Sequence, residues 1–261
     1  MKSIDTKHYL LEVTLRRDDV PSFEQYPFCL PAIANLKTLT LHPSVTFIVG
    51  ENGTGKSTLL EAIAVAWGFN PEGGSQNFQF QSRLSHSQLH EFLNLKRGLY
   101  RPRDGFFLRA ESFFNLATNI EQLDRAAEEA GGYGKPIISF FGGRSLHEQS
   151  HGESFFTLLT TRFGGKGLYI LDEPEAALSP SRQMAALSRM HQLVKKGAQF
   201  IIATHSPIIM AYPDADIVLL TDKGLRKTAY TETEHYTVAR QFLGNHRQML
   251  DILLKGDEGA E

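Results

Sequence analysis

The feature that most constrains this chain is a glycine-rich loop between an apolar run and a helical pattern. The loop matches G-x-x-x-x-G-K-[ST], a pattern in which backbone amides surround phosphate groups. The β-branched run Val45–Val49 before it is typical of a buried strand, and Ser57–Trp67 after it has apolar residues at helical spacing. This strand–loop–helix order predicts an α/β fold with a phosphate-binding loop. The loop consists of Gly50, Glu51, Asn52, Gly53, Thr54, Gly55, Lys56, Ser57 and Thr58.

The residue types in this loop suit a nucleotide bound together with a metal ion. Glycines let the backbone turn tightly, and successive N–H groups and the N-terminus of the next helix attract phosphate. Lys56 is expected to reach the β- and γ-phosphates, and the Ser57 hydroxyl is expected to coordinate Mg²⁺. A chance glycine-rich turn is the alternative, and the strand and helix on either side count against it.

Two acidic residues directly follow a second apolar run. Leu168–Leu171 is typical of a buried strand, and Asp172 and Glu173 come at its carboxyl end, where α/β folds bind ligands. Asp172 is expected to hold Mg²⁺, and Glu173 to accept a proton from an attacking water or to orient it. The two acids could instead cap a helix that follows Pro174.

A third segment has the same form. The apolar run Phe200–Ala203 is typical of a strand, and Thr204 and His205 follow it. A histidine at this strand end can contact a γ-phosphate and report its presence. A lone histidine is more often structural, but its position after the third core strand favours a functional role.

The alternation of strand and helix patterns predicts a parallel sheet with helices on both faces. We expect an α/β, P-loop NTPase fold with a mostly parallel central sheet, N-terminal antiparallel strands and an inserted helical subdomain. Residues 1–261 would form one domain, with a core lobe of residues 1–68 and 150–261 and a helical insertion at about residues 69–149. Further elements are predicted at residues 9–16, 39–41, 87–96, 106–109, 113–130, 154–162, 181–195, 217–220 and 234–254.

Composition counts against several other classes of protein. The 261 residues carry a net charge of −2 without a long run of like charge, which argues against binding nucleic acid through bulk charge. The polar segment Met1–Lys7 lacks the apolar core of a signal peptide, and no stretch approaches the length of a membrane span. We therefore expect a soluble, cytoplasmic protein. The single cysteine, Cys29, excludes an internal disulfide and is expected in the core.

Taken together, the three motifs resemble the ABC-type ATPase superfamily, which includes transporter ATPases and chromosome and DNA-repair ATPases. The resemblance implies ATP as the nucleotide. In that superfamily a signature segment before the acidic strand binds the γ-phosphate of ATP held by a second subunit. Here Gln149–Glu153 takes that place: Ser150 and Gly152 fit the pattern, whereas His151 and Glu153 depart from it. The same segment could be an ordinary helix start, capped by Ser150 and Glu153.

Two further motifs map onto the segments after the strands. Glu175–Pro180 is similar to the superfamily's D-loop, which crosses the dimer interface, with Ser179 in place of the usual aspartate. His205 takes the place of the histidine switch. The stretch Arg109–Asn115, with the signature segment, also resembles stand-alone bacterial ATPases that have the ABC engine without a transporter.

The remaining motifs of the superfamily are harder to place. Glu111 is the expected substitute for the Q-loop glutamine, because Gln79 and Gln81 lie closer to the phosphate loop than that motif requires. Tyr26 or Phe28 could stack on adenine, and either could instead belong to the core.

The resemblance implies an ATPase that works as an ATP-sandwiched homodimer and drives a conformational switch. Its catalytic residues would be Lys56, Glu173 and His205. The altered signature segment leads us to expect that it is not a transporter subunit. One alternative is a nucleotide-gated module that binds nucleic acid or a protein, with the basic stretch Lys96–Arg109 either contacting phosphates or forming a solvated face. Another is the ATPase subunit of a transporter with a separate membrane partner.

Overall fold

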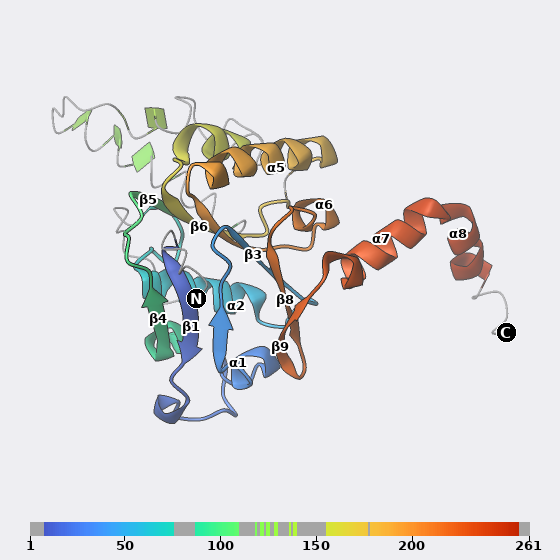
Figure 1. Cartoon of the computed structure of the whole chain (residues 1–261), viewed down its shortest axis with the longest axis horizontal. Helices are drawn as coiled ribbons and strands as arrows, with labels where there is room; N and C mark the ends of the chain where they lie inside the picture. Colours follow the sequence, from blue (N-terminus) through green and yellow to red (C-terminus); the bar gives the residue numbers. More distant parts are fainter. Residues whose placement is uncertain are drawn as a thin grey trace, which may run out of the picture.

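The computed structural model describes residues 8–75, 87–109, 155–176 and 178–255, together with a few isolated positions between 118 and 139. Two sheets and the helices packed on them form the body of the molecule (Figure 1). The last two helices, α7 and α8, extend away from this body as an arm.

The central sheet has six strands, five of them parallel. The first five follow the order β5-β6-β7-β3-β8 with parallel pairing, and β9 pairs antiparallel with β8 at one edge. Every residue of β3, β6 and β7 is buried, as expected for parallel strands covered on both faces. In spatial order the strands are β5 (Asp104–Arg109), β6 (Gly167–Asp172), β7 (Gln199–Ala203), β3 (Val45–Val49), β8 (Asp216–Thr221) and β9 (Gly224–Thr228).

A second, antiparallel sheet consists of β2 (Thr38–Thr40), β1 (Leu10–Leu15) and β4 (Leu93–Arg97). The buried side chain of Gln199, the first residue of β7, joins it to the central sheet. Its Oε1 accepts hydrogen bonds from the N–H groups of Tyr9 and Leu10 at 3.1 and 3.0 Å. Its Nε2 donates to the carbonyls of Leu10 and His42 at 2.8 and 3.0 Å.

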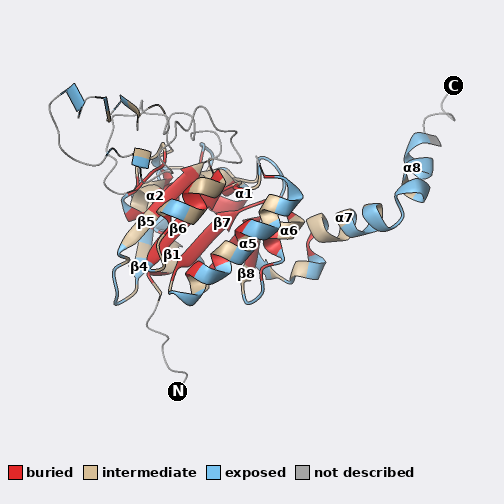
Figure 2. Ribbon diagram, turned by 90° about the horizontal axis from the view of Figure 1, so that it is seen from above, coloured by how far each residue is buried: buried red, intermediate tan, exposed pale blue. Residues whose placement is uncertain are grey.

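Helices cover both faces of the central sheet, and Figure 2 shows the buried strands between them. Alternate residues of the strands pack on opposite faces, so that Ile48 lies with α2 and Phe47 lies with α5. The helices are α1 (Pro31–Ala34), α2 (Lys56–Trp67), α5 (Pro180–Lys195), α6 (Pro207–Met210), α7 (Glu234–Gly244) and α8 (His246–Lys255). Shorter helical turns are η1 (Arg17–Asp19), η2 (Gln88–Phe92), η4 (Leu158–Arg162) and η5 (Tyr230–Glu232).

The predicted fold class is confirmed, with three corrections. First, β4 and β5 lie inside the expected helical insertion, yet they pair with β1 and β6, so residues 93–109 belong to the core lobe. The segment at residues 87–96, predicted as a helix, is the turn η2 followed by β4, because pairing with β1 outweighs its local pattern. Second, Cys29 is exposed and not part of the core. Third, β9 was not predicted. Most of the remaining insertion lies outside the described residues.

Candidate nucleotide-binding site

The glycine-rich loop connects the end of β3 to the start of α2, and two of its glycines are required by their surroundings. Gly55, the N-cap of α2, has φ +95°, and a Cβ atom there would lie 3.0 Å from Leu30 Cδ1. A Cβ atom on Gly50 would lie 2.8 Å from the carbonyl oxygen of Leu220 in β8. The loop therefore has no room for side chains at these points, which lets its backbone approach a ligand closely.

The lysine of the loop is buried and folds back over it. Lys56 Nζ donates hydrogen bonds to the carbonyls of Gly50 and Glu51 at 2.9 and 2.8 Å. Burial lowers the pKa of Lys56, and the nearby carboxylates of Glu173 and Asp172 oppose this shift. The cation is thus held beside the loop amides and within the field of both acids.

The acidic strand end meets the start of α2 at a pair of oxygen atoms. Asp172, the last residue of β6, is buried, and its Oδ1 accepts a hydrogen bond of 3.1 Å from Ser57 Oγ. A hydroxyl and a carboxylate are hard oxygen ligands of the kind that Mg²⁺ prefers. Within the described part of the chain no group of three or more His, Cys, Asp or Glu residues could hold a metal. A magnesium ion between Ser57 and Asp172 would therefore take its other ligands from phosphates and water.

Glu173 occupies a strained turn immediately after β6. Its φ is +49°, an uncommon value for a residue other than glycine, and its N–H donates to the Ala203 carbonyl of β7 at 2.9 Å. This turn brings Glu173 Oε1 within 3.5 Å of His205 Nε2, with 40% and 30% of the two side chains exposed. The acid is thus accessible to water and faces the histidine.

His205 contacts a second histidine on its other side. His205 Nδ1 lies 3.0 Å from Nε2 of His235, in the first turn of α7. Burial lowers the pKa of both rings. The charge of Lys56 lowers the pKa of His205 further, and His205 lowers that of His235, whereas the carboxylates of Glu173 and Glu234 oppose these shifts. A hydrogen bond between two ring nitrogens requires at least one neutral ring, which agrees with the direction of these shifts.

Glu175 holds the loop that carries His205. Its Oε1 accepts hydrogen bonds from the N–H groups of His205 at 2.6 Å and Ser206 at 3.2 Å. Burial raises the pKa of Glu175, and hydrogen bonds from the Thr204 side chain and the His205 amide only partly offset this. Ser206 Oγ in turn donates to Gln183 Oε1 of α5 at 2.5 Å. The acidic strand end, the histidine loop and α5 are therefore one hydrogen-bonded unit.

Curated proteins and a solved structure are similar to this chain over most of its length. The energy-coupling factor transporter ATP-binding protein EcfA2 of Methanospirillum hungatei is 24% identical over 88% of this chain and 58% of its own length. The putative ABC transporter ATP-binding protein TTE0246 of Caldanaerobacter subterraneus subsp. tengcongensis is 26% identical over 74% of this chain and 82% of its own. A structure described as the ATP-binding subunit of an ABC transporter is 21% identical with a TM-score of 0.44, covering 90% of this chain and 93% of that one.

Two family models also match the chain. One is described as an AAA domain and matches residues 25–126. The other is described as an AAA domain, putative AbiEii toxin, type IV TA system, and matches residues 81–211, half of the chain. The chain belongs to the ABC-type P-loop ATPase superfamily. Members of this superfamily bind and hydrolyse ATP.

The fold of this ATPase brings together the three motifs predicted from its sequence. The phosphate loop, Asp172, Glu173 and His205 meet at the carboxyl ends of β3, β6 and β7. Within the loop, Thr54 Oγ1 donates to the Glu51 carbonyl at 2.8 Å. The expected signature residues Ser150 and Gly152 lie outside the described residues, as do the Q-loop candidates Glu111, Gln79 and Gln81.

The two candidates for adenine stacking have different environments. Phe28 is buried and packs edge-on against Phe92, with ring centroids 5.0 Å apart, so it belongs to the core. Tyr26 is 65% exposed, and its Oη lies 3.2 Å from Thr58 Oγ1 beside the phosphate loop. Tyr26 therefore remains the candidate.

Two residues near the site were missed from sequence. Glu175 was interpreted only as part of the D-loop segment, although its carboxylate holds the histidine loop. His235 lies 30 residues from His205, and no local pattern links the two.

Ser179 of the D-loop segment Glu175–Pro180 is the N-cap of α5, where its Oγ accepts a hydrogen bond from the Arg182 N–H at 3.4 Å. Only the fold reveals these contacts.

Proposed function

We propose that this ABC-type ATPase hydrolyses ATP bound at the phosphate loop and uses the reaction to switch between a closed dimer and an open state. The hydrogen bond of 3.1 Å between Ser57 and Asp172 carries the proposal, because it joins the phosphate loop to the acidic strand end. Glu173 and His205 stand beside this junction. A phosphate-binding loop alone would indicate nucleotide binding without hydrolysis.

Each residue of the site has a role that follows from its contacts. Lys56 would exchange the carbonyls of Gly50 and Glu51 for the β- and γ-phosphates, and the loop amides would bind the same phosphates. Ser57 and Asp172 would hold Mg²⁺, which when bound neutralises charge on the β- and γ-phosphate oxygens.

Glu173 and His205 would act on the attacking water and the γ-phosphate. Glu173 accepts a proton from the water. As it does so, the oxygen of the water bonds to the γ-phosphorus and the bond to the leaving ADP breaks. His205, kept neutral by burial, can donate a hydrogen bond to a γ-phosphate oxygen from the nitrogen that faces Glu173. ADP and inorganic phosphate are the products.

Dimer formation is the part of the proposal that rests on the family resemblance. Ser150 and Gly152 of a second copy would complete the site by binding the γ-phosphate from the other side. Hydrolysis would then weaken the bridge and open the dimer.

The test of this function is the substitution Glu173→Gln. We expect it to keep ATP binding, slow hydrolysis by about 100-fold or more, and accumulate an ATP-bound dimer in size-exclusion chromatography. The matched control is Glu24→Gln, which makes the same change at an exposed carboxylate and should hydrolyse ATP like the wild type. Hydrolysis by Glu173→Gln at the wild-type rate would show that the base is assigned wrongly.

A second candidate function is that of a transporter subunit. Both curated relatives described above are transporter ATP-binding proteins, which favours this alternative over our expectation of a non-transporter ATPase. In the described parts of the chain, no helix has the length and hydropathy to cross a bilayer. The family resemblance implies a separate membrane subunit for this function, which would copurify in fixed stoichiometry from detergent extracts and change the ATPase rate. An ATPase that purifies alone from such extracts would count against this function.

A further inference from the structure

A basic pocket lies at the edge of the central sheet opposite the nucleotide site. Apart from Tyr9, which precedes β1, its residues come just before β5, β6 and β7, whereas the phosphate loop, Asp172 and His205 lie at the carboxyl ends of strands in the same sheet. The pocket has a volume of about 570 Å³. Tyr9, Tyr100, Arg101, Arg103, Lys166, Val194, Lys195, Lys196 and Gly197 line it. The proposed ATPase cycle uses none of these residues.

Five cations lie around this pocket: Arg101, Arg103, Lys166, Lys195 and Lys196. All five side chains belong to exposed residues, and among the described residues none of them forms an ion pair within 4.0 Å. The acid next in sequence, Asp104, turns inward: it pairs with Arg162 at 2.7 Å and accepts a hydrogen bond from Tyr169 Oη at 2.8 Å. A cluster of positive side chains attracts a polyanion.

The pocket corrects the sequence interpretation of the basic stretch Lys96–Arg109. Arg97 stacks on the ring of Trp67 at 4.5 Å, and Arg109 pairs with Glu61 of α2, so both are used within the fold. Arg101 and Arg103 remain. Lys166, Lys195 and Lys196 join them from segments more than 60 residues away, and the backbone hydrogen bond from Arg103 N–H to the Lys166 carbonyl, at 2.8 Å, ties the two segments together.

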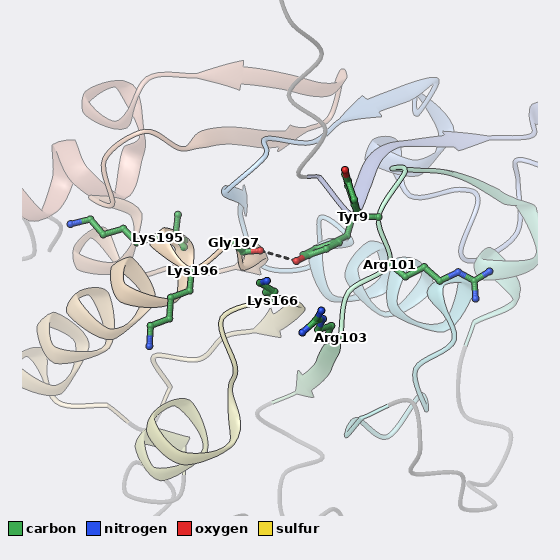
Figure 3. Close-up of a pocket in the computed structure, with 9 residues that line it drawn as sticks. Tyr9, Arg101, Arg103, Lys166, Lys195, Lys196 and Gly197 are labelled. Atoms are coloured by element: carbon green, nitrogen blue, oxygen red, sulfur yellow. Dashed lines mark hydrogen bonds between the residues drawn. The ribbon is translucent and has the colours of Figure 1, made fainter.

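The arrangement of the cations suits an extended ligand. Figure 3 shows Lys166 and Arg103 in the middle, Lys195 and Lys196 at the end of α5 on one side, and Arg101 on the other. In this view the five side chains are spread from one side of the pocket to the other and do not converge on one point. A compact anion such as free phosphate would engage only part of such a spread, whereas a chain of phosphates could engage all of it.

Aromatic residues complete the pocket. Tyr9 is buried, and its Oη donates to the Gly197 carbonyl at 2.9 Å, which fixes the wall between β1 and the end of α5. Tyr100, beside Arg101, is 59% exposed and presents an aromatic surface to solvent. Cations that follow a backbone, next to an exposed ring on which a base can stack, are the combination by which proteins bind single strands.

We propose that this pocket binds a single strand of nucleic acid, with phosphates on the five cations and a base stacked on Tyr100. Stacking on a ring distinguishes this ligand from an anionic membrane or an acidic protein segment, which would use the charges alone. None of the residues that line the pocket belongs to the nucleotide site, so strand binding can be measured without ATP hydrolysis.

The first experiment measures binding of a labelled oligothymidine of about 15 nucleotides to the full chain by fluorescence anisotropy. Saturating ADP is present, so that the oligonucleotide cannot occupy the phosphate loop. Five phosphate contacts predict a slope of about −3.5 in a plot of log affinity against log salt concentration. The double variant Arg103→Ala, Lys166→Ala should make the slope less steep, at about −2.

Matched variants separate this site from general surface charge. Lys223→Ala with Arg226→Ala removes two exposed cations from the β8–β9 hairpin and should leave affinity and slope unchanged. Tyr100→Ala should weaken binding by about 5- to 150-fold without changing the slope, since stacking is uncharged. Leu99→Ala, an 84% exposed neighbour that does not line the pocket, should have no effect. Thermal unfolding of each variant checks that it folds.

Several outcomes would overturn the proposal. One is failure of the wild type to bind the oligonucleotide at low salt. Another is an equal loss of oligonucleotide affinity in the pocket variant and in the hairpin variant. Free thymidine monophosphate binding as tightly as the oligonucleotide would indicate a nucleotide site and not a strand site. Equal binding to vesicles with anionic lipid, unaffected by Tyr100→Ala, would indicate a membrane surface. Loss of ATPase activity in Glu173→Gln has no bearing on any of these results.

Discussion

Glu175 offers a sharp test of how the histidine loop is held. Replacing it with leucine keeps the approximate size of the side chain but removes the acceptor of the His205 N–H and one of the two acceptors of the Ser206 N–H. The Ser206 N–H keeps Thr204 Oγ1 as an acceptor at 3.0 Å, but the partly buried His205 N–H would lack a partner, so the variant should lose about 1–3 kcal/mol of unfolding free energy. Glu175→Gln keeps an acceptor oxygen at the same place and should lose no more than about 0.5 kcal/mol.

Urea unfolding and ATP hydrolysis measure the two consequences. Glu175→Leu should lower the urea midpoint and also reduce the rate of hydrolysis, because His205 loses its anchor beside Glu173. Glu175→Gln should keep most of the wild-type urea midpoint and most of the wild-type rate of hydrolysis. Glu24→Leu, a substitution at an exposed glutamate, should stay within about 0.5 kcal/mol of the wild type. If Glu175→Leu unfolds within about 0.5 kcal/mol of the wild type, or if Glu175→Gln is as destabilised as Glu175→Leu, the carboxylate of Glu175 does not hold the loop.

Two further predictions concern stability. Gln199→Leu removes the four hydrogen bonds that Gln199 makes with Tyr9, Leu10 and His42 at the junction of the sheets, and it should lower the unfolding free energy, measured in urea, by at least about 4 kcal/mol. Gln192→Leu on the exposed face of α5 should change it by less than about 0.5 kcal/mol. A loss under about 1 kcal/mol for Gln199→Leu would mean that the sheets are held by apolar packing alone. Burial lowers the pKa values of His205 and His235 from 6.5 in the folded protein. Below pH 6.5 the unfolded chain therefore binds more protons than the folded protein. The contribution of the two histidines to stability is complete above pH 6.5 and is lost as the pH falls through their lowered pKa values. The midpoint of thermal unfolding should therefore drop on acidification below pH 6.5, and the drop should be smaller in His235→Gln; an equal drop in the variant would contradict the role of this pair.

The local chemistry of the nucleotide site could be predicted from the sequence because it is encoded in short segments. A β-branched run, a glycine-rich loop and a helix follow one another within residues 45–67, and each constrains the next. The apolar runs that become β6 and β7 end at Asp172 and Ala203, and parallel strands place such ends along one edge of the sheet. The fold class and the meeting of Lys56, Asp172, Glu173 and His205 follow from that rule.

The tertiary structure decided everything that depends on which distant segments lie side by side. Strand pairing placed β4 and β5 in the sheets although the surrounding residues had suggested a helical insertion. Contacts of Glu175 with the histidine loop and of His235 with His205 join residues 30 apart in the chain, with no periodic pattern between them. The basic pocket likewise collects Arg103 and Lys166 from separate strand starts. Such contacts are set by strand order and register, which come from burying the whole apolar surface at once and cannot be derived from any one stretch of sequence.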